Sequence, residues 1–290
     1  MADIVLGIGT SHSPLLTFDA SLWESYATRD LVSTRMNLSD GRYVTYQELL
    51  AERGGPYADI STPAHFQARG AACQAALDRI ADDIAAVNPD VVVVVTDDHS
   101  ELFRLSNMPA VSIYYGDEIK TMPRASVAHL QFEREKDYFS QMTKSYAMDR
   151  SHTFAADPAF AKELIERMID KDVDMGAAAT IDDPVQAGLG HGVGFVIQRL
   201  FRGKSIPVVP VLLNTYYPPN APSAAARAAE PSRTRRWRKM SAVGAPRAAT
   251  GWRRCSASVS RASTMLWMAS SMPYCTSKPS TRFTFSELTW

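Results

Sequence analysis

Val91-Val92-Val93-Val94-Val95 runs directly into Thr96-Asp97-Asp98-His99, and this stretch decides the fold of the chain. Five consecutive valines without polar alternation are typical of a strand buried on both faces, as in the centre of a parallel sheet. A second apolar run, from Ile4 to Thr10, ends in the same way at Ser11-His12-Ser13-Pro14. Open α/β sheets bind ligands beyond the carboxyl ends of their strands. We therefore expect His12 and His99 to share a metal or catalytic centre at that edge.

The segments around these runs alternate between helical and extended patterns. Thr62 and Pro63 begin a predicted helix, whose apolar face is formed by residues 73, 77, 80 and 84. The other predicted elements are strands over 110–115 and 206–213 and helices over 157–168 and after 191. Residues 17–61 form a long polar stretch with turn signals. The alternation predicts an α/β fold, a three-layer sandwich with a mixed or largely parallel central sheet.

A third histidine, His191, lies among four glycines in the segment from Gly188 to Gly194. Glycine lets backbone and substrate approach closely, so the cluster favours a functional site. The alternative is a flexible turn in which the histidine is incidental. The pair Asp182-Asp183 either orients His191 or forms a solvated turn. We expect the remaining histidines to be exposed to solvent: His65, His129 and His152.

Composition excludes several classes of protein. Three cysteines without ligand spacing argue against a disulfide framework or a zinc site, and they favour a reducing, cytoplasmic location. The apolar runs are too short to span a membrane. The chain has no phosphate-binding glycine loop, no nucleophile elbow and no CxxC pair, which removes the commonest nucleotide-binding, hydrolase and zinc-finger functions.

The composition changes near Pro222. Residues 223–290 contain ten Arg and two Lys against Glu230 and Glu287, a net charge of +10, so residues 1–222 carry the balancing −10 of the neutral chain. Four of the five tryptophans lie in the same basic segment, which shows no regular period. We therefore expect a catalytic domain over 1–222 and a basic, atypical tail over 223–290 that is disordered or translated out of frame.

Five blocks of residues resemble the class III extradiol ring-cleavage dioxygenases, the family of the protocatechuate 4,5-dioxygenase β subunit and of gallate and 3-O-methylgallate dioxygenases. These blocks are Gly7-Ile8-Gly9-Thr10-Ser11-His12, Asn88-Pro89-Asp90-Val91 through Asp98-His99, Asn107-Met108-Pro109-Ala110 with Ile113-Tyr114-Tyr115-Gly116, Gly190-His191-Gly192, and Val211-Leu212-Leu213-Asn214-Thr215-Tyr216-Tyr217-Pro218-Pro219.

The resemblance implies non-haem Fe(II) held by His12, His99 and a glutamate, with His191 as the acid–base residue. Asp97, beside the second ligand, would orient the ligands without binding the metal. The implied reaction is extradiol cleavage of a catecholic aromatic acid with O₂, in an aromatic-compound catabolic route. The resemblance also implies a homo-oligomer or a small partner subunit, whereas the short apolar runs predict no membrane association.

The chain lacks the Gly-Gly-x-Ser-His segment that precedes the family's glutamate ligand. Back-translation of residues 261–269, read from each third codon base, permits Gly-Leu-Asn-His-Val-Val-Asp-Gly, which favours a frameshift. We then expect no third ligand and no final strand, since Glu230 lies in surroundings that predict no strand. The alternative functions are an inactive remnant of the enzyme and, through the basic tail, a nucleic-acid-binding protein.

Overall fold

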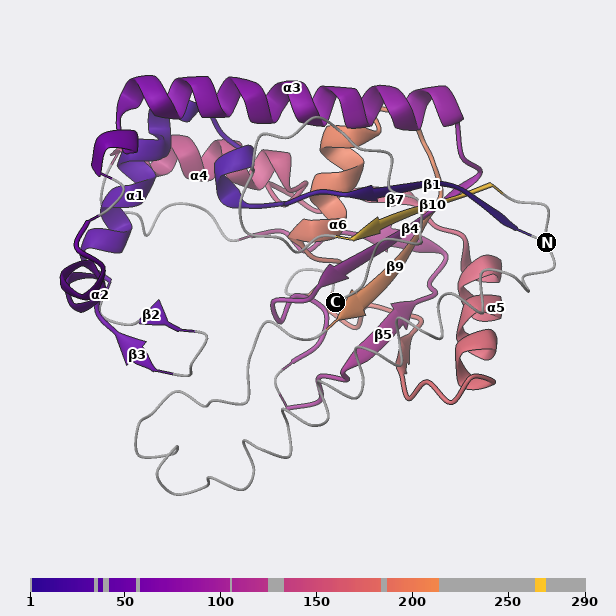
Figure 1. Cartoon of the computed structure of the whole chain (residues 1–290). Coiled ribbons are helices and arrows are strands. Elements are labelled where there is room, and N and C mark those ends of the chain that lie inside the picture. The colour runs from indigo at the N-terminus through magenta and orange to yellow at the C-terminus, as the bar shows by residue number, and fades with distance from the viewer. Residues whose placement is uncertain are drawn as a thin grey trace.

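The chain folds around a six-stranded mixed sheet with helices on both faces (Figure 1). The computed structural model describes residues 2–33, 36–38, 42–55, 58–104, 106–124, 133–183, 187–213 and 264–269. The sheet order is β1-β10-β4-β9-β5-β8, in which β9 and β5 are antiparallel and the other neighbours are parallel. The predicted three-layer α/β fold with a mixed sheet is therefore confirmed.

The sheet strands are β1 (Asp3–Gly9), β4 (Val91–Asp97), β5 (Val111–Tyr114), β8 (Gly176–Ala178), β9 (Val208–Leu213) and β10 (Thr264–Ala269). The helices are α1 (Trp23–Leu31), α2 (Tyr46–Arg53), α3 (Pro63–Val87), α4 (Glu133–Ser145), α5 (Pro158–Ile169) and α6 (His191–Phe195), the last continued by a π-helical turn over Val196–Leu200. Two small antiparallel pairs lie outside the sheet, β2 (Met36–Asn37) with β3 (Tyr43–Val44) and β6 (Glu118–Lys120) with β7 (Thr153–Ala155).

The valine strand is buried on both faces because each face packs against a separate apolar cluster. Val92 and Val94 join a cluster that includes residues of α3, α4 and α6. Val91, Val93 and Val95 join a second cluster, which includes the apolar face of α5. All five valines are buried, so no position of the strand requires a polar side chain.

The helix boundaries follow from local signals that the sequence carries. Thr62 caps α3, since its hydroxyl accepts a hydrogen bond from the His65 amide at 3.4 Å, and the left-handed Asn88 ends the helix. Asp157 caps α5 in the same manner. The long polar stretch before residue 62 contains α1 and α2, which the sequence analysis did not predict.

The strand β10 comes from the basic segment and lies in the sheet between β1 and β4. The expectation that this segment contributes no strand is therefore wrong for residues 264–269. The predicted boundary at Pro222, Glu230 and the remainder of 223–290 lie outside the described residues. In the described part of the chain, no helix has both the length and the apolar character needed to cross a membrane.

Candidate functional site

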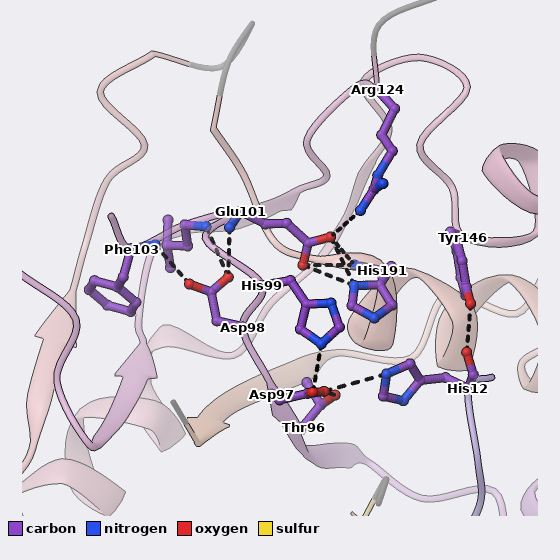
Figure 2. A network of polar contacts seen from close by, with 11 residues as sticks. His12, Thr96, Asp97, Asp98, His99, Glu101, Phe103, Arg124, Tyr146 and His191 are labelled. Carbon is purple, nitrogen blue, oxygen red and sulfur yellow. Dashed lines mark hydrogen bonds and ion pairs between the residues drawn. The ribbon is translucent and has the colours of Figure 1, made fainter. Parts of the chain in front are cut away.

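Side chains from two parallel strands meet beyond the carboxyl edge of the sheet (Figure 2). His12 follows β1, Asp97 ends β4, and His99 lies two residues further on. The Asp97 carboxylate lies between the two imidazoles: Oδ1 is 3.4 Å from His12 Nε2, and Oδ2 is 2.8 Å from His99 Nε2. The structure thus brings together the two histidines that the sequence analysis predicted as metal ligands.

His12 is held as a neutral imidazole. Burial, together with the charge of His191, lowers the pKa of His12 to about 4, although the carboxylate of Asp97 acts in the opposite direction. Its buried Nδ1 has no hydrogen-bond partner among the described residues. Its backbone carbonyl accepts a hydrogen bond of 2.6 Å from the hydroxyl of Tyr146. A neutral imidazole with a lone pair to offer is the form that binds metal ions.

Asp97 is ionised in this environment. Burial favours the neutral carboxyl, but the hydrogen bond with His99 and the electrostatic interactions with the surrounding imidazoles outweigh burial and lower the pKa of Asp97 to about 2. The site therefore combines imidazole nitrogens with one carboxylate, that of Asp97, which lies between His12 and His99.

His191 begins α6 and is oriented by a buried carboxylate. Its Nδ1 lies 2.8 Å and 3.0 Å from the two carboxylate oxygens of Glu101, and its backbone N–H donates to the same carboxylate at 3.3 Å. Arg124 Nη2 is 3.4 Å from Glu101 Oε1. Burial opposes ionisation of Glu101, but the hydrogen bond and electrostatic interaction with His191, together with the charge of Arg124, prevail and lower the pKa of Glu101 to about 2.

A tight turn presents His99 and Glu101 on the same side. Asp98 accepts backbone hydrogen bonds from Glu101 and Leu102 at 3.0 Å and from Phe103 at 2.9 Å. Ser100, at the centre of the turn, has a φ of 64°, in the left-handed region. The buried Asp98 side chain thus supplies the acceptors that the backbone of this turn needs.

The donor set fits a divalent transition metal. One ligand atom each from His12, Asp97 and His191 lies within 4.8 Å of the others, so these residues could hold a metal ion. The ring of His191 is centred 4.7 Å from that of His12 and 4.3 Å from that of His99. Imidazole nitrogen with carboxylate oxygen suits iron and its neighbours in the first transition row, and the unpaired Nδ1 of His12 is consistent with such a site.

The other predicted candidates lie elsewhere or pair differently. Asp182 accepts a hydrogen bond from Thr180 and is exposed, and Glu101 occupies the orienting position beside His191, so the solvated-turn interpretation of Asp182 holds. His65 is exposed in the first turn of α3, as expected. The expectation for His152 is wrong, because its side chain is only 15% exposed, 2.7 Å from Asp149. His129 lies outside the described residues.

Three residues of the site were not predicted from the sequence: Glu101, Arg124 and Tyr146. Glu101 had a usable signal, since it lies two residues after His99 in the turn that follows the same strand. Arg124 and Tyr146 had none, because they reach the site from segments with no polar motif of their own.

The chain matches the model of a protein family. The model of the family described as the catalytic LigB subunit of aromatic ring-opening dioxygenase matches residues 62–227. The matched range includes Asp97, His99, Glu101 and His191, whereas His12 precedes it. No curated protein matches the chain.

Proposed function

We propose, since the chain belongs to the family of the catalytic LigB subunit of aromatic ring-opening dioxygenases, that it is an extradiol dioxygenase dependent on non-haem Fe(II). Its substrate would be a catecholic aromatic acid of the protocatechuate, gallate or 3-O-methylgallate type. The observation that carries the proposal is the Asp97 carboxylate between His12 and His99, with the oriented His191 beside them.

The residues that would hold iron are His12 and His99, with Asp97 as the carboxylate nearest to both. Two histidines and one carboxylate with open positions are the usual donors of non-haem Fe(II) oxygenases. The position of Asp97 between the two imidazoles supports this role in addition to the orienting role expected from the sequence. When bound, iron would allow electron density to pass from the catecholate ring to O₂.

The protein residues supply orientation and proton transfer. His191 would accept the proton of a catechol hydroxyl and return it later in the reaction, a task suited to a histidine near neutral pH. The neutral state of His12 and the single charge of Asp97 would leave the iron site net positive, which favours the catecholate anion.

A second candidate is an inactive remnant of such an enzyme. It is favoured by the missing Gly-Gly-x-Ser-His segment, because a site that depends on the family's glutamate would then lack its anionic ligand. Sequencing the coding DNA across codons 218–232 distinguishes an unbroken frame from a shifted one.

The proposal is tested by anaerobic reconstitution of the full chain with Fe(II), followed by O₂ uptake and absorbance measurements with a panel of catecholic acids. We expect O₂ consumption and a yellow ring-opened product with at least one acid, and neither with the His12→Ala variant. Stoichiometric iron without turnover on any substrate would favour the remnant. A homo-oligomer or small partner subunit and a cytoplasmic location remain part of the proposal, and light scattering of the purified chain tests the former.

A further inference from the structure

The carboxylate of Glu101 is buried, and its shortest contacts are with the ring of His191. Its side chain is 1% exposed, and both oxygens lie within 3.0 Å of His191 Nδ1. The two residues are 90 positions apart in the chain, so no local element requires this contact. Burial of a carboxylate is unfavourable unless the group is paired and hydrogen-bonded, and the hydrogen bonds from His191 offset this free energy.

The partners of Glu101 leave it only acceptor roles. The His191 backbone N–H donates to both oxygens at 3.3 Å, and the Arg124 guanidinium lies 3.4 Å from Oε1. Nδ1 lies within 3.0 Å of both oxygens, each of which already accepts from a backbone N–H, and this geometry fits one Nδ1–H shared between two acceptor oxygens. The hydrogen on His191 is therefore on Nδ1, and in the neutral ring Nε2 bears the lone pair.

We infer that Glu101 is a positioning residue that fixes His191 in its Nδ1–H tautomer and presents the Nε2 lone pair to the site. The imidazole is packed on three sides, with ring centres 4.7 Å from His12, 4.3 Å from His99 and 5.1 Å from Tyr146. Rotation of the ring by a half turn would turn Nδ1 away from Glu101 and cost the buried carboxylate its shortest hydrogen bond, of 2.8 Å.

The lack of a side chain at Gly190 is a second, independent observation that supports the position of Glu101. A Cβ atom at Gly190 would overlap the Glu101 carboxylate, which is the nearest group to that position. The absence of a side chain at residue 190 is thus a condition for the carboxylate to reach both the backbone and the ring of His191.

The role in proton transfer rests on the proposed function. A catechol O–H bond would break, its electron pair would stay on oxygen, and the proton would form an N–H bond at Nε2 of His191. The resulting imidazolium would donate through Nδ1 to Glu101, which stabilises its charge. The same nitrogen would return the proton afterwards, so the residue pair ends unchanged.

The tautomer is measurable without any activity. In the full chain labelled with ¹⁵N-histidine and purified without added metal ion, NMR correlations from ring nitrogens to ring carbon-bound protons distinguish the two tautomers, and a His191→Asn variant assigns the signals. We expect the Nδ1–H tautomer for His191 in the unmodified chain. The Nε2–H tautomer there would overturn the inference, whether or not the protein turns over a substrate.

Variants then test the dependence on Glu101. Glu101→Gln can donate from its amide to Nδ1, so we expect loss of the single tautomer, and turnover reduced roughly ten- to a hundredfold with KM and iron content unchanged. Gly190→Ala, which keeps Glu101 but displaces it, should have the same effect, whereas the exposed control Glu118→Gln should have none. An unchanged tautomer in Glu101→Gln, or iron loss as complete as in His12→Ala, would overturn the inference.

Discussion

The hydroxyl of Tyr146 donates a 2.6 Å hydrogen bond to the backbone carbonyl of His12, across 134 residues of sequence. Burial raises the pKa of Tyr146 well above its usual value, so the phenol stays protonated and able to donate. This bond fixes the backbone of a candidate metal ligand from the segment that follows α4.

Tyr146→Phe should therefore weaken both the fold and the metal site. Loss of the donor leaves the His12 carbonyl unpaired, and we expect the free energy of unfolding to fall by about 1 to 3 kcal/mol. Fe(II) affinity, measured by competition with a chelator, should fall as well. Tyr114→Phe is the matched control, because its hydroxyl donates to the Glu118 carbonyl, and Fe(II) binding should not change. Equal iron affinity in the two variants would contradict the link to His12.

The roles of the three histidines can be separated by iron content. We expect His12→Ala and His99→Ala to lose bound iron, whereas His191→Ala should keep iron and lose rate. The measurement is iron per chain after gel filtration, together with turnover. The ligand atoms of His12, Asp97 and His191 also lie close enough to share a metal. If His191→Ala lost iron as completely as His12→Ala, the metal would belong to that second set.

Asp97→Asn tests the carboxylate donor. Removal of the anionic oxygen between His12 and His99 should lower Fe(II) affinity by more than the roughly ten- to hundredfold that follows loss of a residue that only orients ligands. Titration with Fe(II) under anaerobic conditions measures the change, and Asp182→Asn serves as an exposed control. An affinity loss within that range would return Asp97 to the orienting role.

Acid should destabilise the metal-free chain in two pH ranges. The pKa of His12 is about 4 in the fold against 6.5 in the unfolded chain, so the unfolded state binds more protons and stability falls as pH drops from 6.5 to 4. A shift of this size corresponds to at most about 3 kcal/mol. The pKa values of Asp97 and Glu101, about 2, lie below their unfolded values, so their contribution is lost between about pH 4.5 and 2.

Urea unfolding between pH 2 and 8 checks both ranges. His12→Gln should flatten the curve between pH 6.5 and 4 and leave the lower range in place. A curve for His12→Gln with the same slope as the unmodified chain in the upper range would show that His12 does not cause it.

Removal of β10 should damage the sheet and the site together. A chain that ends at residue 222 loses the strand that joins β1 to β4, so β1 loses its hydrogen-bonding partner in the sheet and His12 loses its fixed distance from Asp97. We expect aggregation and no iron binding, measured by light scattering and metal analysis. A chain that ends at residue 269 keeps β10 and should behave like the full chain. A stable, iron-binding chain 1–222 would show that β10 is dispensable.

The central fold could be read from the sequence because its signals act over a few residues. The valine run is buried on both faces, and Thr62 and Asp157 cap two helices that were predicted to begin at these residues. The helices α1 and α2 were not predicted from the sequence, because they lie in a polar stretch and have few buried apolar residues. Six residues of the basic segment, 264–269, join the sheet; they form a short apolar run, but the segment around them shows no regular period that would predict a strand.

The sequence by itself determined that His12, Asp97 and His99 would lie at or just beyond the carboxyl ends of two strands, because strand length and direction follow from the local apolar pattern. Only the tertiary structure decided that Glu101 pairs with His191 and that Tyr146 supports His12. These contacts join residues far apart in the chain. Such pairs form where packed elements place them, and no periodicity, cap or turn residue encodes which distant partner a buried carboxylate or hydroxyl will meet.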